Sequence, residues 1–289
     1  MVAIRNLALL LVAGLLAAAP GRGRSEVFAA DRPTLLQPSL FAQAAAATLK
    51  QKFSDREVSF LLLDASTGAV LALRWDDPEK PIPLGSLVKP FAALAYGEQH
   101  QFRYPTHTCR GTATGCWLPR GHGPVNLDSA IAHSCNSYFR ALTANLTAAE
   151  VSPLAVRFGL QPPSARVYGP ALAGLGNEWL ISPVNMARAY LELLRRRDQP
   201  GARQILAGMA ESARQGTGLE VDRALPYPDA LVKTGTAACA HREHGPGDGF
   251  VVAITPAEKP QTLLMVRVHG VAGAQAARTA GKMLREIQQ

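Results

Sequence analysis

The sequence predicts an α+β protein: an antiparallel sheet of about five strands, flanked by terminal helices, with an inserted all-helical lobe. Three observations lead to this fold class. Strand-like segments occur only near the two ends, within residues 57–75 and 230–268, and the long stretch 87–213 has helical patterns. A further helical run lies outside the strands at each end. Strands from both ends can join one sheet when the middle forms a second lobe, and ligands commonly bind between two such lobes.

The size and composition agree with one globular unit. The chain has 289 residues, 47% of them hydrophobic and 18% charged, which is enough apolar material for one core or for two lobes that share a cleft. The formal net charge is +8, but the basic residues are scattered. The densest run, residues 195–197, ends a helical pattern, where cations suit the helix dipole. We therefore expect no nucleic-acid partner.

The N-terminus has the pattern of a secretory signal peptide. Arg5 precedes an apolar run, Leu7–Ala19, that is shorter than the roughly 20 residues needed to cross a bilayer. Because Pro20 disfavours cleavage directly after Ala19, we expect the cut nearer Ala29. Residues 1–29 are thus predicted to be a signal peptide, and the mature protein to be exported to the periplasm or another extracytoplasmic compartment.

The first folded elements are expected to be a helix and a β-hairpin. Leu40–Phe53 is rich in alanine and ends in basic residues, which is typical of a helix. Glu57–Asp64 is apolar and strand-like, residues 66–68 (Ser-Thr-Gly) form a turn, and Ala69–Trp75 is a second strand.

The spacing of hydrophobic residues differs between the middle and the end of the chain. After a proline-rich link, a helical run extends from Gly85 to Tyr96, and the clearest later helix begins with Ser182 as N-cap and Pro183 in the first turn. Beyond residue 228 the pattern predicts three strands and a last helix, at Ala230–Ala237, Gly249–Ile254, Thr262–Val268 and Ala274–Ile287.

A first motif with catalytic chemistry is Ser86-x-x-Lys89. On the opening turn of a helix, residues three apart face the same way, so the serine oxygen and the lysine amine can meet. A lysine can remove the serine proton if burial lowers its pKa, and the helix N-terminus offers N–H donors for an oxyanion. Alone the motif is a weak signal, because a helix start with a surface lysine is the better explanation of such a short pattern.

A second motif, Ser134-x-Asn136, follows a helical run. A turn here would send both polar side chains to one side, while Cys135 faces the packing. The hydroxyl could pass a proton to a leaving amine, and the amide could hold a peptide bond. By itself the motif is better explained by a turn that caps a helix.

The third motif is a string of four residues on a predicted strand: Lys233, Thr234, Gly235 and Thr236. A lysine and two hydroxyls at a strand edge can bind a carboxylate, and the glycine lets a substrate backbone approach closely. A solvent-facing strand is the plain alternative, but this string is rarer by chance than the other two.

In this order along the chain, the three motifs resemble those of the penicillin-recognising serine acyltransferases, the penicillin-binding proteins and serine β-lactamases. The resemblance covers about residues 64–270 and implies a β-lactamase/transpeptidase-like fold, with residues 38–289 as the catalytic domain. It includes flanks that are similar to those of penicillin-binding transpeptidase domains: Gly85–Phe91, Ala132–Phe139, Ile181–Ala187, Gly216–Gly218 and Val232–Ala237.

The resemblance implies a mechanism with an acyl-serine intermediate. Ser86 would attack the penultimate D-alanine carbonyl of a peptidoglycan stem peptide, with Lys89 taking its proton. Ser134, together with Lys233, would relay a proton to the departing D-alanine. Asn136 would hold the substrate amide.

The same resemblance implies the binding groups and the partners. Thr234 and Thr236, with Lys233, would bind the terminal carboxylate, with Gly235 between them, and the N–H groups of Ser86 and Thr236 would form the oxyanion hole. β-Lactams would act as covalent inhibitors by leaving a long-lived ester on Ser86. The resemblance implies no metal and no organic cofactor, and a cell-wall protein is a candidate partner.

Several activities remain open at this point. The acyl-enzyme could react with an amine (D,D-transpeptidase) or with water (D,D-carboxypeptidase), and the flanks favour the first. A serine β-lactamase of a class D-like kind, in which water rapidly hydrolyses the β-lactam ester, is a further alternative. A class A enzyme would carry a Glu-x-x-Leu-Asn motif, which the sequence lacks, and a class D enzyme would carry an apolar residue in place of Asn136. A non-catalytic β-lactam-binding or wall-docking module is the alternative outside enzymes.

The four cysteines are of interest in an exported protein. Cys109 and Cys116 lie in a Gly/Thr-rich stretch and could form a disulfide, or could be two free thiols on a loop. A zinc site made of these two with His107 and His122 is a further alternative, although the spacing matches no common pattern. The other two cysteines, Cys135 and Cys239, are expected to be small, partly buried residues beside the motifs.

Overall fold

The computed structural model describes residues 40–239, 245 and 247–288. Residues 38–289 form one compact unit. The predicted signal peptide, residues 1–29, lies outside the described residues. Within the described part of the chain, no helix is both long enough and apolar enough to cross a membrane.

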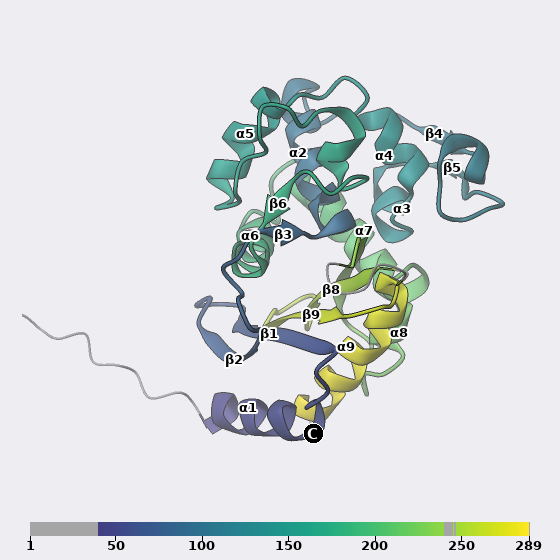
Figure 1. Cartoon of the computed structure of the whole chain (residues 1–289). Helices are drawn as coiled ribbons and strands as arrows, with labels where there is room; N and C mark the ends of the chain where they lie inside the picture. Colours follow the sequence, from purple (N-terminus) through teal and green to yellow (C-terminus); the bar gives the residue numbers. More distant parts are fainter. Residues whose placement is uncertain (1–39, 240–244, 246, 289) are drawn as a thin grey trace, which may run out of the picture. The chain divides into compact units, whose positions relative to one another are not determined.

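A five-stranded antiparallel sheet lies at the heart of this unit, in the order β2-β1-β9-β8-β7 (Figure 1). Its strands are β1 (Val58–Asp64), β2 (Val70–Arg74), β7 (Leu231–Ala237), β8 (Asp248–Thr255) and β9 (Thr262–Val268). Strand β1, from the first part of the chain, pairs along its whole length with β9, from the last part. The predicted α+β fold, with one sheet built from both ends of the chain, is confirmed.

Each face of the sheet has its own hydrophobic core, because successive side chains of a strand point to opposite faces. In β1, Leu61 and Leu63 pack with the helical lobe, whereas Phe60 and Leu62 pack with α1 (Leu40–Lys52) and α9 (Gly273–Gln288). Figure 1 shows α1 and α9 on the side of the sheet away from the helical lobe, as predicted for the terminal helices.

The middle of the chain forms the predicted helical lobe. Its helices are α2 (Lys89–Gln99), α3 (Leu127–Ala132), α4 (Asn136–Leu142), α5 (Ala148–Arg157), α6 (Pro183–Arg195) and α7 (Ala202–Gln215), with 3₁₀ turns η1 (Gly85–Val88), η2 (Gly111–Thr114) and η3 (Gly169–Ala173). The short helix α8 (Leu219–Asp222) follows the lobe and packs in the core of α1 and α9. Helix α6 begins as predicted, because the Ser182 side chain accepts a hydrogen bond from the Asn185 N–H at 3.2 Å and Pro183 occupies the first turn.

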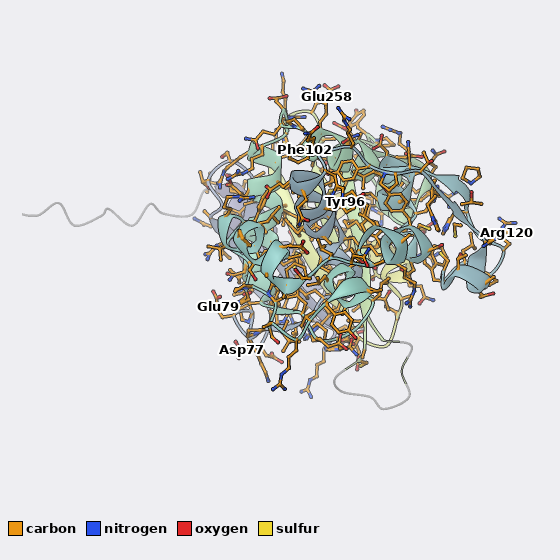
Figure 2. All side chains as sticks on the ribbon, turned by 90° about the horizontal axis from the view of Figure 1, so that it is seen from above. Asp77, Glu79, Tyr96, Phe102, Arg120 and Glu258 are labelled. Atoms are coloured by element: carbon orange, nitrogen blue, oxygen red, sulfur yellow. The ribbon has the colours of Figure 1, made fainter. Side chains whose placement is uncertain are left out.

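Two short ladders in this lobe were not predicted. Strand β3 (Ile82–Pro83) pairs with β6 (Leu180–Ile181), and β4 (His107–Cys109) pairs with β5 (Gly123–Val125). Strands of two or three residues are too short to produce an alternating pattern in the sequence. Figure 2 shows Arg120 at the outer end of the loop that joins β4 to β5.

Candidate active site

Ser86 is placed by a close backbone contact between η1 and β7. Gly85 has a φ of +53°, and a Cβ atom on it would lie 2.0 Å from the carbonyl oxygen of Thr236. A Cβ atom on Gly235 would lie 2.6 Å from the carbonyl oxygen of Leu84. A side chain at either glycine would push the two segments apart, so both glycines are needed to hold Ser86 beside β7.

The second motif forms a tight turn between α3 and α4. Ser134 has a φ of +48°, in the left-handed region that is uncommon for residues other than glycine. Among the hydrogen bonds that hold the turn, the Cys135 N–H donates to the Ala130 carbonyl at 2.9 Å, and Lys89 Nζ donates to the Ser134 carbonyl at 2.8 Å.

Two fully buried lysines meet at the Ser134 side chain. Lys89 Nζ lies 3.3 Å from Ser134 Oγ and 2.7 Å from Asn136 Oδ1. From the other side, Lys233 Nζ donates to Ser134 Oγ at 3.0 Å and to the Thr234 carbonyl at 2.7 Å. Lysines from the first and third motifs therefore meet at one hydroxyl of the second.

Burial lowers the pKa of both lysines, because a buried ammonium loses its hydration. The pKa of Lys89 falls to about 7 through burial, which outweighs the opposing effect of Cys135 and Cys116, and Arg140 lowers it further. Burial and the charge of Lys89 hold the pKa of Lys233 well below its ordinary value. A lysine with a pKa near 7 is partly neutral at neutral pH, so Lys89 can accept a proton there.

The motif side chains line a cleft of about 710 Å³, a size suited to a small-molecule or peptide ligand. Thr234 is buried and Thr236 is exposed, and Thr236 Oγ1 accepts a hydrogen bond from the Gly273 N–H at 3.0 Å. The structure brings together, in or beside this cleft, all the site residues expected from the sequence: Ser86, Lys89, Ser134, Asn136, Lys233, Thr234, Gly235 and Thr236.

Two further residues shape the site and were missed in the sequence. Thr217 Oγ1 lies 2.6 Å from Thr234 Oγ1, which donates to it, and the only signal for it is its place in the 216–218 flank. Trp117 Nε1 donates to the carbonyls of His133 and Ser134 at 3.2 and 3.3 Å. No pattern around Trp117 indicates that it borders the cleft.

The structure rules out two of the alternatives given above for the cysteines, the disulfide and the zinc site that includes His107. All four lie among the described residues and are free thiols, so there is no disulfide between Cys109 and Cys116. The zinc alternative that includes His107 is wrong, because the ligand atoms that lie within 4.8 Å of one another are those of Cys109, Cys116, His122 and Cys135, and His107 Nε2 is hydrogen-bonded to Ser137 Oγ at 2.6 Å. In the described part of the chain, two groups have ligand atoms close enough to share a metal ion: Cys109, Cys116, His122 and Cys135, and Cys239, Asp248 and His269.

Comparisons with known proteins agree with this geometry. The family described as "Penicillin binding protein transpeptidase domain" matches residues 58–289. The search of curated proteins finds no match.

Several solved structures have the same fold. Pseudomonas aeruginosa PBP2 in complex with WCK 5153 has a TM-score of 0.69 and 19% identity over 86% of this chain and 73% of that one. The complex of Helicobacter pylori PBP2 with MreC has a TM-score of 0.69 and 18% sequence identity, over 84% of this chain and 62% of that one. This chain therefore spans less than two thirds of that protein. A D,D-transpeptidase domain from Eggerthella lenta has a TM-score of 0.67 and 17% sequence identity, over 84% of this chain and 80% of that one.

Proposed function

The chain belongs to the penicillin-binding protein transpeptidase domain family, and from this we propose that it is a serine D,D-acyltransferase of peptidoglycan stem peptides. Family membership identifies a penicillin-binding serine acyltransferase. The proposal adds the donor, a peptide that ends in D-Ala-D-Ala, and the roles of the residues in the cleft.

In the proposed acylation step, Ser86 Oγ bonds to the carbonyl carbon of the penultimate D-alanine as its proton passes to Lys89 Nζ. The N–H groups of Ser86 and Thr236 bind the oxyanion of the tetrahedral intermediate. The C–N bond to the terminal D-alanine then breaks, and the leaving nitrogen receives a proton through Ser134 Oγ, with Lys233 beside it. The products are an ester on Ser86 and free D-alanine.

The remaining residues bind the peptide. Asn136 holds the amide of the donor. Thr234 and Thr236, with the Lys233 ammonium, bind the carboxylate of the terminal D-alanine. Gly235 leaves room for the peptide backbone to lie along β7. A β-lactam would enter the same cleft and acylate the same serine.

One observation carries this proposal: the two buried lysines, from motifs far apart in the sequence, both lie within hydrogen-bond distance of Ser134 Oγ, at 3.3 and 3.0 Å. A chain of exchangeable protons between two lysines of lowered pKa is what proton transfer from a nucleophile to a leaving amine requires. A structural role explains neither the burial of two lysines nor the strained backbone of Ser134.

We further propose that the ester is transferred to an amine, since the motif flanks resemble those of transpeptidase domains. The enzyme would act outside the cytoplasm, where its peptidoglycan substrate is found, after export directed by residues 1–29. The solved complex of Helicobacter pylori PBP2 with MreC supports a cell-wall protein partner for this chain as well.

The first test is labelling of the purified protein with a fluorescent penicillin, followed by the release of the label over time. We expect a stable label on the wild type and none on Ser86→Ala. Absence of label on the wild type would refute an active acyl-serine site, and release within seconds would indicate a β-lactamase. Lys89→Ala, which removes the proposed base, should also fail to label. Its matched control is Lys282→Ala, which changes an exposed lysine on α9 and should label normally.

The second test separates the two cell-wall activities. The protein is incubated with a pentapeptide stem, with and without an amine acceptor, and the products are measured by mass spectrometry. We expect a cross-linked product when the acceptor is present. Release of D-alanine with only the hydrolysed tetrapeptide, at all acceptor concentrations, would identify a carboxypeptidase instead.

A further inference from the structure

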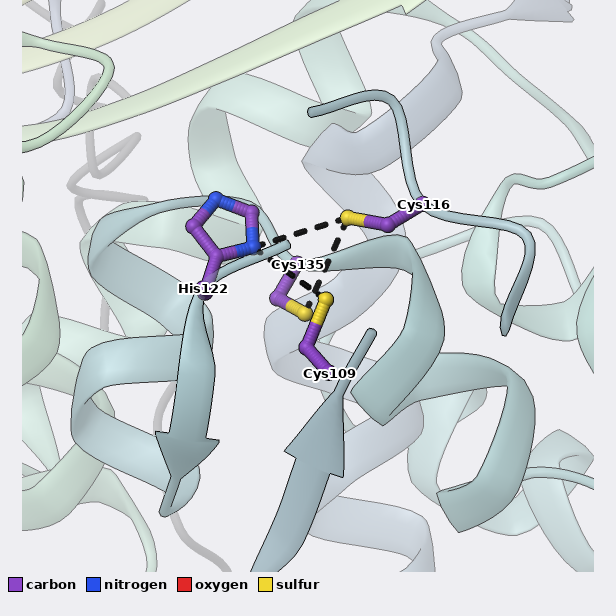
Figure 3. A group of neighbouring side chains, drawn as sticks. All are labelled: Cys109, Cys116, His122 and Cys135. Carbon is purple, nitrogen blue, oxygen red and sulfur yellow. Dashed lines mark hydrogen bonds between the residues drawn. The ribbon is translucent and has the colours of Figure 1, made fainter. Parts of the chain in front are cut away.

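Four side chains with metal-binding atoms converge beside the Ser134 turn (Figure 3). Cys109 ends strand β4, Cys116 lies in the following loop, His122 precedes β5, and Cys135 precedes helix α4. All four ligand atoms lie within 4.8 Å of one another. The three cysteines are buried, with exposed fractions of 2%, 5% and 0% in chain order.

Three of the separations within this group match those around a tetrahedral zinc ion, and the other three are at most 4.8 Å. His122 Nδ1 lies 3.5 Å from both Cys109 Sγ and Cys116 Sγ, and the sulfurs of Cys116 and Cys135 are 3.9 Å apart. Zinc bonds of about 2.3 Å to sulfur and about 2.0 Å to nitrogen, at tetrahedral angles, give separations of about 3.6 Å between nitrogen and sulfur and about 3.8 Å between sulfurs. The three separations are therefore those expected of atoms that bind one ion between them.

We propose that these four side chains bind one zinc ion, which fixes the turn that carries Ser134 and Asn136. Three thiolates and one imidazole form the Cys₃His set of structural zinc sites, and soft sulfur ligands select zinc over magnesium or calcium. With four protein ligands the coordination sphere is complete, so the ion has no open position for substrate. Its role is structural.

A disulfide explains the group less well than a metal does. A disulfide joins two sulfur atoms at about 2.0 Å and does not explain why the third thiol and the imidazole lie beside them. Here three sulfurs and one ring nitrogen surround a common point, and His122 Nδ1 is equally distant from two of the sulfurs. This symmetry is expected of ligands around a shared ion.

The site is connected to catalysis through the chain itself. Cys135 lies directly between Ser134, whose φ of +48° needs support from its surroundings, and Asn136. Cys116 precedes Trp117, whose indole N–H donates to the carbonyls of His133 and Ser134. A metal bound to both cysteines would hold the loop and the turn together, so Cys109, Cys116 and His122 are positioning residues for the proposed acylation.

The metal is tested directly on the full chain, purified with reductant, stripped with a chelator and titrated with Co²⁺ and then with Zn²⁺. We expect one Co²⁺ per chain, with the thiolate charge-transfer absorption and the intense visible bands of tetrahedral cobalt, and its displacement by one equivalent of Zn²⁺. A wild-type protein that is folded by circular dichroism and binds neither ion would overturn the proposal.

Matched variants locate the ion. Cys116→Ser and His122→Gln should lose binding, whereas Cys239→Ser and His107→Gln, a cysteine and a histidine outside the group, should keep it. Binding that persists in Cys116→Ser or disappears in Cys239→Ser would place the ion elsewhere and refute the site. Loss of two hydrogens in the mass of the exported protein, mapped by peptide analysis to Cys109 and Cys116, would show a disulfide in its place.

The coupling to catalysis rests on the proposed function and has its own readout. Removal of zinc from the folded wild type should lower the rate constant for penicillin acylation at least about tenfold, and added Zn²⁺ should restore it. Unchanged acylation after zinc removal would refute the positioning role. A protein that binds one zinc ion but never acylates would refute the proposed function while leaving the metal site intact.

Discussion

The chemistry of Lys89 follows from its complete burial. Burial lowers its pKa from 10.5 to about 7, and only the neutral amine can take the proton of Ser86. The neutral fraction increases with pH up to this pKa. We therefore expect the second-order rate constant for acylation by benzylpenicillin to rise about tenfold per pH unit below about pH 7 and to level off above it, measured from about pH 5 to about pH 9.

Two checks accompany this pH profile. Lys89→Arg should not be acylated at any pH, since a guanidinium keeps its proton, and a pH-independent wild-type rate would contradict the assignment of the base. The lowered pKa of Lys89 also makes the stability of the folded protein depend on pH. Between about pH 7 and 10.5 the unfolded chain binds a proton at Lys89 that the folded protein does not, so this group makes the free energy of unfolding increase with pH across that window.

Thr217 offers a test of a single hydrogen bond. Its Oγ1 accepts from Thr234 Oγ1 at 2.6 Å and holds the Thr234 side chain in place. For Thr234 to bind a substrate carboxylate as proposed, its proton must turn to the substrate, and Thr217 Oγ1 can then donate to Thr234 in return. We expect Thr217→Val to lower the acylation rate constant by roughly two- to twelvefold, the equivalent of about 0.5–1.5 kcal/mol, and Thr217→Ser to retain most of it. Thr255→Val, which removes a hydrogen bond to the Asp229 carbonyl away from the cleft, should leave the rate unchanged.

At the scale of elements, the contact between η1 and β7 decides where the nucleophile lies. Gly85 has a positive φ, and a Cβ atom there would lie 2.0 Å from the Thr236 carbonyl oxygen. We expect Gly85→Ala to abolish penicillin labelling and to lower the free energy of unfolding, measured by urea denaturation, by more than the roughly 1–2 kcal/mol that left-handed backbone alone costs.

The matched control for this variant is Gly159→Ala. Gly159 has a similar φ of +69°, but a Cβ atom there would meet no other atom within 4 Å. Gly159→Ala should lower the free energy of unfolding only by the roughly 1–2 kcal/mol that left-handed backbone costs, and it should be labelled normally by penicillin. If both variants behave alike, the close approach of η1 to β7 does not position Ser86.

The helical lobe also shows which elements a sequence encodes locally. Helix α6 could be predicted at its first residue, because Ser182 and Pro183 form a local cap. Strands β4 and β5 could not, since three-residue strands are stabilised by the ladder that they form with each other. These unpredicted strands are the ones that bring Cys109 and His122 together.

For the whole molecule, the central sheet separates two cores that share its strands. Leu62 and Leu63 are adjacent and fully buried, but Leu62 faces α1 and α9 and Leu63 faces the helical lobe. We expect Leu62→Ala and Leu63→Ala each to cost about 2–5 kcal/mol in a single unfolding transition. Tryptophan fluorescence and circular dichroism should give the same midpoint for each variant, and two separate transitions would show that the cores unfold independently.

The fold class, the three motifs and the family resemblance could all be predicted from the amino-acid sequence, because strand and helix periods are local and the motifs are short strings of unusual composition. Which side chains meet in space depends on the folded chain. Lys89 and Lys233 are far apart along the chain and contact one Ser134 hydroxyl, and the buried Cys135 also lies beside Cys109, Cys116 and His122. Such distances are set by the pairing of strands and the packing of two lobes, and neither is encoded in the spacing of any one segment.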